Sequence, residues 1–254
     1  MGCLKLTPLN HAFLNKPISH RGLHDHSRGI IENSSSAFAA SIAAGLPIEC
    51  DLQSSSDGLA VVFHDAYLSR LTNLDGDTKS LTSVELNATQ LKDSDDLIQT
   101  FEQLLQQVGG AVPLLVEIKD QSGELGPTPT EFIKHIAKCA NSYQGVIALM
   151  SFNPFLIEAL HKIAPNLCIG LVTDDFASDD WPDVPKKRAH LLNNLDAVSG
   201  LDIAFISHNR TDLARVANLD LPKLCWTVKS EAEETAARAI ADNITFEGYM
   251  PAIK

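Results

Sequence analysis

Short apolar segments alternate with amphipathic stretches along almost the entire chain. The apolar segments predict nine β-strands, near residues 17–20, 47–53, 59–63, 113–118, 146–151, 167–172, 202–206, 223–228 and 244–249. The amphipathic stretches predict seven helices, near residues 33–44, 100–108, 129–141, 153–163, 187–197, 211–217 and 230–241. Strands that alternate with helices in this way form a parallel sheet with helices packed outside it.

One interval breaks this alternation. The stretch from Asp51 to Leu114 is too long for a simple crossover, because a complete βαβ unit needs roughly 30 residues. We interpret it as a strand that ends at His64 and Asp65, followed by an insertion of loop and short helix at about residues 66–99. The chain has 254 residues, and a (β/α)8 barrel typically needs about 250. We therefore predict an α/β fold, a (β/α)8 TIM barrel forming a single domain over residues 1–254, with a small insertion after strand 2.

Composition and charge exclude several classes of protein. The net charge is −12, from 20 basic and 32 acidic residues, whereas a nucleic-acid-binding surface is usually basic. No apolar run approaches the roughly 20 residues that cross a bilayer, and the first 17 residues do not resemble a secretory signal. The five cysteines are scattered without a CxxC motif, which favours free thiols in a reducing compartment. We expect a cytoplasmic protein that acts on a small molecule, without nucleic acid or an integral membrane segment.

Chemically versatile side chains lie on or just after the early apolar segments, where strands end. Alternate residues of a strand share a face, so Glu49 projects with Asp51, and Glu117 projects with Lys119. Three converging carboxylates make a hard oxygen site for a divalent cation. His20 and His64, which also follow apolar segments, suggest acid–base chemistry on a phosphate ester.

The same residues also have ordinary structural explanations. Glu49 and Asp51 could belong to a solvated edge strand, and Glu117 with Lys119 could form a simple buried ion pair. Buried inward carboxylates need compensation, however, and the strands of a parallel barrel are enclosed. His24 and His26 are expected in a loop, where contact with the substrate stays open. We treat the other histidines as structural, because they lie on terminal or helical segments or follow a strand: His11, His135, His161, His190 and His208.

The ordered motifs resemble the glycerophosphodiester phosphodiesterase family, a group of phosphodiesterase TIM barrels. The resemblance covers most of the chain and is dense over residues 17–119. Its motifs are His20-Arg21-Gly22, Glu32-Asn33, Glu49-x-Asp51, Asp57-Gly58, Val61-Val62-x-His64-Asp65, Leu68-x-Arg70-x-Thr72 and Glu117-Ile118-Lys119. Weaker matches are Ser151-Phe152-Asn153 and Trp226-Thr227-Val228.

This resemblance implies a role for each matching residue. Glu49, Asp51 and Glu117 would bind a divalent cation, Mg²⁺ or Ca²⁺, and His20 and His64 would act as the acid–base pair. Arg21 and Lys119 would hold the phosphate, and Trp226 would line the pocket around the substrate alcohol. Two further roles are suggested by position rather than by the resemblance. Glu32, before the helix start, would orient Arg21, support the metal site or be only structural, and Asp65, next to His64, would fix the His64 ring or serve only in a turn. The implied reaction is metal-dependent hydrolysis of glycerophosphodiesters to glycerol 3-phosphate and an alcohol, in lipid and glycerol metabolism.

Some alternatives stay open at this level. A phospholipase-D-like lyase could use the same barrel, although such proteins generally act outside the cell and carry disulfides. A catalytically weak phosphate-ester binding protein is the other alternative, although the full set of site residues is present. The sequence does not identify the alcohol, the metal, the attacking group or the oligomeric state. The last strand, residues 244–249, departs from the family pattern. The sequence shows no long helix after this strand, and residues 4–16 are therefore expected to cover the bottom of the barrel.

Overall fold

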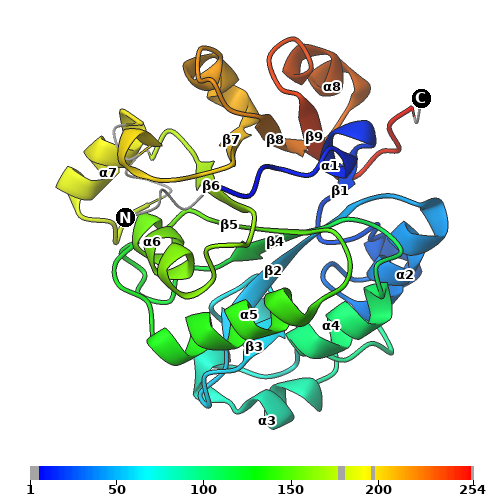
Figure 1. Ribbon diagram of the computed structural model, residues 1–254. Coiled ribbons are helices and arrows are strands. Elements are labelled where there is room, and N and C mark those ends of the chain that lie inside the picture. Colours follow the sequence, from blue (N-terminus) through cyan, green and yellow to red (C-terminus); the bar gives the residue numbers. More distant parts are fainter. Residues whose placement is uncertain (1–5, 177–180, 196–197, 253–254) are drawn as a thin grey trace. The chain divides into compact units, whose positions relative to one another are not determined.

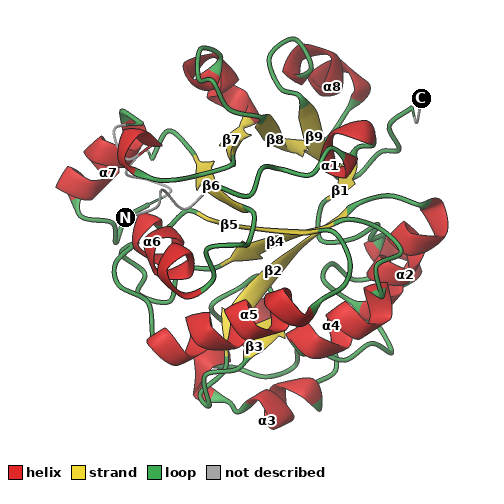
Figure 2. Ribbon diagram, in the orientation of Figure 1, coloured by secondary structure: helices red, strands yellow, loops and turns green. Residues whose placement is uncertain are grey.

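The computed structural model describes residues 6–176, 181–195 and 198–252, and these residues divide into two compact units. Unit 1 comprises the N-terminal segment to Pro17, residues 120–128 and residues 148–254. Unit 2 comprises residues 18–119 and 129–147. Figures 1 and 2 show the elements of both units. The predicted single domain over residues 1–254 stays a prediction.

Unit 2 is built on three parallel strands and one antiparallel strand. Its strands are β1 (Ile18–Ser19), β2 (Ile48–Ser54), β3 (Ala60–Val62) and β4 (Leu114–Ile118). Strand β2 pairs in parallel with β1 and β4, and it forms an antiparallel hairpin with β3. Every residue of β2 and β4 is buried, as expected for strands of a parallel sheet covered on both faces.

The helices of unit 2 begin at residues whose side chains cap them. The α-helices are α2 (Ser35–Ala44), α3 (Ser83–Asn87), α4 (Phe101–Val108) and α5 (Thr130–Ser142), and the 3-10 helices are η1 (His26–Arg28), η2 (Leu68–Arg70) and η3 (Thr78–Ser80). Thr82 and Thr100 form capping boxes with Glu85 and Gln103, so two amide groups at each helix start are satisfied. Ser34 caps α2, and Gly45 ends it in the left-handed conformation that glycine adopts easily.

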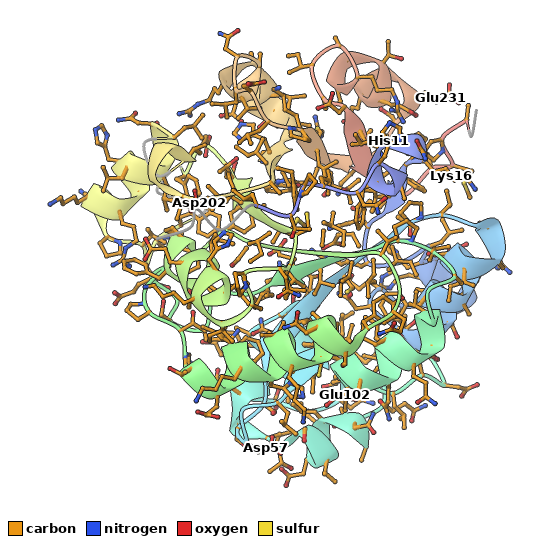
Figure 3. The ribbon with its side chains drawn as sticks, in the orientation of Figure 1. His11, Lys16, Asp57, Glu102, Asp202 and Glu231 are labelled. Carbon is orange, nitrogen blue, oxygen red and sulfur yellow. The ribbon has the colours of Figure 1, made fainter. Side chains whose placement is uncertain are left out.

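The predicted insertion lies in unit 2 and has its own small hydrophobic core. It contains η2, η3 and α3, and Asp57 in the β2–β3 turn receives hydrogen bonds from the Ser83 amide and hydroxyl at the start of α3. Figure 3 labels Asp57 beside this helix. The core joins insertion residues to the β3 region and comprises Ile31, Val61, Phe63, Leu68, Leu71, Leu86, Leu91 and Ile98.

Unit 1 contains five consecutive parallel strands. They are β5 (Ile147–Ser151), β6 (Ile169–Thr173), β7 (Phe205–Asn209), β8 (Lys223–Val228) and β9 (Asn243–Phe246), each paired with the next. The α-helices of this unit are α1 (Ala12–Asn15), α6 (Pro154–Ile163), α7 (Lys186–Asn193) and α8 (Glu231–Ala237), and its 3-10 helices are η4 (Val198–Gly200) and η5 (Arg210–Val216). The element that was predicted as a helix near 211–217 is therefore a 3-10 helix.

The element order and the parallel pairing confirm the predicted (β/α)8 TIM-barrel fold class. Strand β3 is the additional antiparallel strand that precedes the insertion. The divergent last strand does form, and the amide of Asn243 at its start donates to the carbonyl groups of Phe13 and Lys16 at 2.6 and 2.7 Å. The N-terminal segment therefore lies at the N-terminal end of β9, as expected.

Two smaller expectations can also be compared with the described residues. Cys50, Cys139, Cys168 and Cys225 are free and buried, as predicted, and Cys3 lies outside the described residues. Burial raises the pKa of Cys168 and Cys225 to about 12, which keeps both thiols protonated. Across the described part of the chain, no helix combines the length and the apolar character needed to cross a membrane.

Candidate active site

Strands β2 and β4 bring three carboxylates together. Asp51 is the direct partner of Glu117 in the parallel register, and Glu49 lies two residues before Asp51 on the same face of β2. One oxygen of each carboxylate lies within 4.8 Å of the others. All three residues are buried, so this cluster is not a solvated edge strand.

His20 and Arg21 lie in the turn that follows β1. The turn needs left-handed backbone at Arg21 and Gly22, with φ of 54° and 78°. A side chain at Gly22 would come within 2.9 Å of Ala37, so glycine is required there. The Arg21 amide donates to Glu49 at 3.0 Å, and the His20 Nε2 lies 3.9 Å from the same carboxylate.

The Arg21 guanidinium joins two further carboxylates. It donates to Glu32 at 2.6 Å, and its Nε lies 3.2 Å from an oxygen of Asp51. On the other side, the Lys119 ammonium lies 2.8 Å from Asp51 and 2.5 Å from Glu117. Both cations are largely buried beside the carboxylates, which is where the sequence predicted them.

The β2–β3 hairpin holds His64 next to strand β2. The Phe63 amide donates to the Asp51 carbonyl group at 3.1 Å, and the Gln53 side chain donates to the His64 carbonyl group at 2.9 Å. The ring Nδ1 lies 2.7 Å from Asp65. The structure thus brings His20, His64 and the two cations together with the carboxylate cluster in unit 2.

The charges of this site are strongly coupled. Burial raises the pKa of Glu49 well above its usual value, and the negative charges of Asp51 and Glu117 raise it further. Burial also acts to raise the pKa of Asp51, but Lys119 and other nearby cations bring it far below the ordinary range. The pKa of Lys119 is raised because its two carboxylate partners outweigh the effect of burial. Glu49 and Asp51 are therefore unequal, and the charge of Glu49 is the less compensated of the two.

The donor set fits a hard divalent cation. Mg²⁺ and Ca²⁺ prefer oxygen ligands, and Mg²⁺ commonly uses few protein carboxylates and keeps water or substrate oxygens. Arg21 and Lys119 bring two positive charges to three buried carboxylates. A divalent cation held by Glu49, Asp51 and Glu117 would supply the missing positive charge.

Two residues have contacts that the sequence reasoning did not predict. Asn33 was placed at the start of the predicted helix near residues 33–44, and its buried side-chain amide group donates to Asp51 at 2.8 Å and accepts from the Asp51 backbone at 3.2 Å. Arg70 binds both Glu32 and Asp65. Both residues lie in the motifs that resemble the family. Their position in those motifs was therefore the only sequence feature that could have marked them as site residues.

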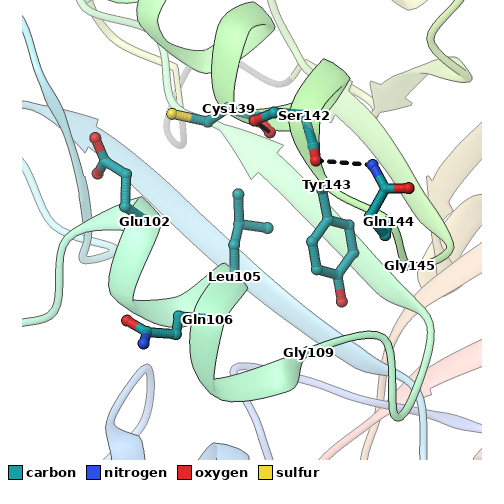
Figure 4. Close-up of a pocket in the computed structure, with 9 residues that line it drawn as sticks. All are labelled: Glu102, Leu105, Gln106, Gly109, Cys139, Ser142, Tyr143, Gln144 and Gly145. Atoms are coloured by element: carbon teal, nitrogen blue, oxygen red, sulfur yellow. Dashed lines mark hydrogen bonds between the residues drawn. The ribbon is translucent and has the colours of Figure 1, made fainter.

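A second group of potential metal ligands lies on helices α4 and α5 of unit 2. It comprises Glu102, His135 and Cys139, beside a pocket of about 370 Å³ between the two helices (Figure 4). The Ala60 amide donates to His135 Nδ1 at 3.0 Å, so the ring proton of the neutral imidazole lies on Nε2. That Nε2 faces Glu102 at 2.7 Å. A protonated Nε2 cannot bind a metal, so this cluster is a hydrogen-bonded pair beside a buried thiol.

Trp226 belongs to unit 1. It lies within β8, and its indole N–H donates to the Ser207 carbonyl group at 3.2 Å. Its ring meets Phe152 edge-on, with centroids 5.5 Å apart. His208 was expected to follow a strand but lies inside β7, fully buried between Thr173 and Asp212, which agrees with its structural assignment.

Comparisons with known proteins identify the family of this chain. The model of the glycerophosphoryl diester phosphodiesterase family matches residues 20–245. A glycerophosphodiester phosphodiesterase of Caldanaerobacter subterraneus subsp. tengcongensis is 30% identical over 184 residues, covering 69% of this chain and 74% of that protein.

Solved structures of similar fold extend the comparison. An Oleispira antarctica phosphodiesterase, solved with the product sn-glycerol-3-phosphate, has a TM-score of 0.75 and 21% identity, covering 93% of this chain and 94% of its own. A glycerophosphodiester phosphodiesterase of Thermotoga maritima has a TM-score of 0.66 and 18% identity, covering 91% and 94% of the two chains. The chain therefore belongs to the glycerophosphoryl diester phosphodiesterase family, and the predicted enzyme class, a phosphodiesterase, is confirmed.

Proposed function

We propose that this enzyme hydrolyses glycerophosphodiesters to glycerol 3-phosphate and an alcohol, with a divalent cation and with His20 and His64 as the acid–base pair. One observation carries the proposal. Three buried carboxylates converge within 4.8 Å, with Arg21 and Lys119 in direct contact with them. Such a site suits a substrate that is an anion and that reacts through a more negatively charged transition state.

Arg21 and Lys119 are the proposed phosphate-binding residues. A phosphodiester repels an incoming nucleophile, so its oxygens must be paired with positive charge before attack. Lys119 keeps its proton beside Asp51 and Glu117, because those carboxylates raise its pKa. Arg21 is held by its left-handed turn and by Glu32, so its guanidinium is already oriented when the phosphate arrives.

The two histidines have the proton-transfer roles. One must take a proton from the attacking hydroxyl group, and the other must give a proton to the leaving alkoxide. Imidazole suits both tasks because its ordinary pKa is near neutrality. Glu49 faces His20 at 3.9 Å, and Asp65 faces His64 Nδ1 at 2.7 Å, so each ring has a carboxylate that can stabilise its protonated form.

The proposed cation, Mg²⁺ or Ca²⁺, neutralises charge on the phosphate oxygens when it is bound. Glu49, Asp51 and Glu117 are its proposed ligands, and Asn33 holds Asp51 in place through its side-chain amide. The assignment of Trp226 to the substrate alcohol stays a prediction, as do the cytoplasmic location and the identity of the alcohol. That the substrate is a small molecule is supported by the product bound to the Oleispira antarctica structure.

The first test measures glycerol 3-phosphate release from glycerophosphocholine. Purified protein is treated with EDTA and then given Mg²⁺ or Ca²⁺, and ³¹P NMR identifies the products. We expect the metal to restore release, and we expect His20→Ala and His64→Ala each to lower kcat at least about 100-fold. The control is His190→Ala, which removes an exposed histidine of α7.

Other results would point elsewhere. A cyclic phosphate as the stable product would identify a lyase-type reaction in which the substrate's own hydroxyl attacks. Tight binding of several glycerophosphodiesters by the metal-loaded protein, without turnover, would indicate a binding protein. Full activity after complete removal of divalent metal would contradict the metal assignment.

A further inference from the structure

Arg70 links two carboxylates, which bind two adjacent edges of its guanidinium. It donates to Glu32 at 2.8 and 2.9 Å, through both terminal nitrogens. It donates to Asp65 at 2.5 and 2.9 Å, through Nε and one terminal nitrogen. Two paired contacts of this kind fix the orientation of both carboxylates, because the donors of a guanidinium are rigid and planar.

Each of these carboxylates orients one residue of the proposed site. Asp65 accepts from His64 Nδ1 at 2.7 Å, and Glu32 accepts from Arg21 at 2.6 Å. Burial acts to raise the pKa of Asp65, but the hydrogen bond with His64, the hydrogen bonds from Arg70 and the charge of Arg70 keep it below its usual range. Asp65 is thus an ionised acceptor, and His64 must carry a proton on Nδ1.

The insertion fixes the position of Arg70. Arg70 ends helix η2, and its neighbours Leu68 and Leu71 are buried in the hydrophobic core of the insertion. The Thr72 hydroxyl donates to the Leu68 carbonyl group at 2.9 Å and closes the same turn. The guanidinium is half exposed, but the backbone that carries it is anchored on both sides. Arg70 therefore connects the insertion to the site through its contacts with Glu32 and Asp65.

We propose that Arg70 is a positioning residue that sets the His64 ring and the Arg21 guanidinium together, through Asp65 and Glu32. This inference rests on the proposed function. Asp65 presents the Nε2 lone pair of neutral His64 for proton transfer, and Glu32 presents Arg21 for the phosphate. Loss of Arg70 releases both carboxylates, so both proton transfer and phosphate binding suffer. The insertion after β3 then serves catalysis as well as covering the sheet.

Kinetics with four variants test the proposal. We expect Asp65→Asn to lower mainly kcat and Glu32→Gln to raise mainly KM, because they act on His64 and Arg21 respectively. Arg70→Met should do both, each by about 10- to 100-fold, as when partners of functional side chains are removed. Arg70→Lys should recover only part of the loss, since an ammonium cannot pair with both carboxylates in the same geometry.

A matched control and a double variant separate positioning from general damage. Arg238→Met removes another partly exposed arginine that is paired with a glutamate, at the C-cap of α8, and it should leave kcat and KM unchanged. In the Asp65→Asn background, Arg70→Met should lower kcat by only about 3-fold or less, because coupled residues do not act additively. Additive losses in kcat would overturn the proposal.

The role of Arg70 can also be tested without substrate, so that the result does not depend on the proposed function. Long-range ¹H–¹⁵N NMR at pH 8 should show the wild-type His64 ring protonated at Nδ1, and Arg70→Met should shift the ring toward the Nε2-protonated form. An unchanged His64 tautomer in a folded Arg70→Met protein would overturn the inference, even if the wild type is an active phosphodiesterase. An inactive wild type with the expected tautomer change would instead refute the proposed function and leave the Arg70–Asp65–His64 coupling supported.

Discussion

Asp51 has several described partners in the candidate site. Lys119, Arg21 and Asn33 all contact its carboxylate or its backbone. The sequence could predict that Asp51 and Glu49 share a face, because alternation along a strand is a local property. It could not predict the contact with Asn33, because that contact depends on a left-handed turn 18 residues earlier. For single residues, the sequence predicts which side chains share a face of a strand, but it does not predict which distant residues they contact.

Glu32 gives a prediction about pH and stability. Burial acts to raise its pKa, but the hydrogen bond from Arg70 and the charge of Arg21 lower it from 4.5 to about 2. The folded protein therefore binds fewer protons than the unfolded chain between about pH 4.5 and pH 2. Glu32 therefore contributes up to about 3 kcal/mol to the free energy of unfolding. This contribution is complete above about pH 4.5 and is lost as the pH falls toward 2.

Urea unfolding of Glu32→Gln at several pH values measures this contribution. The variant should be less stable than the wild type at pH 7, and the difference should shrink at pH 3 and below. Glu158→Gln, an exposed position on α6, is the control and should show little difference at either pH. A gap between wild type and Glu32→Gln that stays constant down to pH 2.5 would contradict the assignment.

Strands and helices were more predictable than the insertion. All nine predicted strands correspond to β1–β9, because each is a short apolar segment bounded by turn residues or helix caps. The hairpin of β2 with β3 places His64 beside Asp51, although no pattern in the sequence indicated that this pairing would be antiparallel. Residues of the insertion are polar on average, and their core depends on Ile31, Val61 and Phe63 from outside it. Such long-range packing leaves no periodic signal in the segment itself.

The core of the insertion predicts a contrast between two leucines. Leu86 of α3 is fully buried, whereas Leu74 is 42% exposed. Leu86→Ala should lower the free energy of unfolding by about 2–5 kcal/mol, because it removes buried methyl groups and leaves a cavity. Leu74→Ala should change it by about 0.5 kcal/mol or less. Urea unfolding followed by circular dichroism compares them, and equal losses would show that the insertion has no stabilising core of its own.

For the whole molecule, the fold class was readable because the alternation of strand and helix persists over the entire chain. The family resemblance was readable because its motifs occur in order over residues 17–119, and the family match extends over residues 20–245. Net charge is less informative, since a chain of net charge −12 places Arg21 and Lys119 together at its carboxylate cluster. The net charge hides this local arrangement of charges, because the arrangement forms only when the chain folds.

The same cluster predicts that stability depends on divalent metal. A ligand that binds only the folded protein stabilises it by about 2.7 kcal/mol at 100 times its Kd, which for a chain of this size raises Tm by roughly 5–10 °C. Mg²⁺ or Ca²⁺ added to EDTA-treated protein should therefore raise Tm in differential scanning calorimetry. Glu49→Gln should abolish most of that rise because it removes one of the three ligands, whereas Glu131→Gln, at an exposed position of α5, should retain it. An equal rise in both variants would show that the metal stabilises the protein from another site, and Glu49, Asp51 and Glu117 would then be a structural ion-pair network around Lys119.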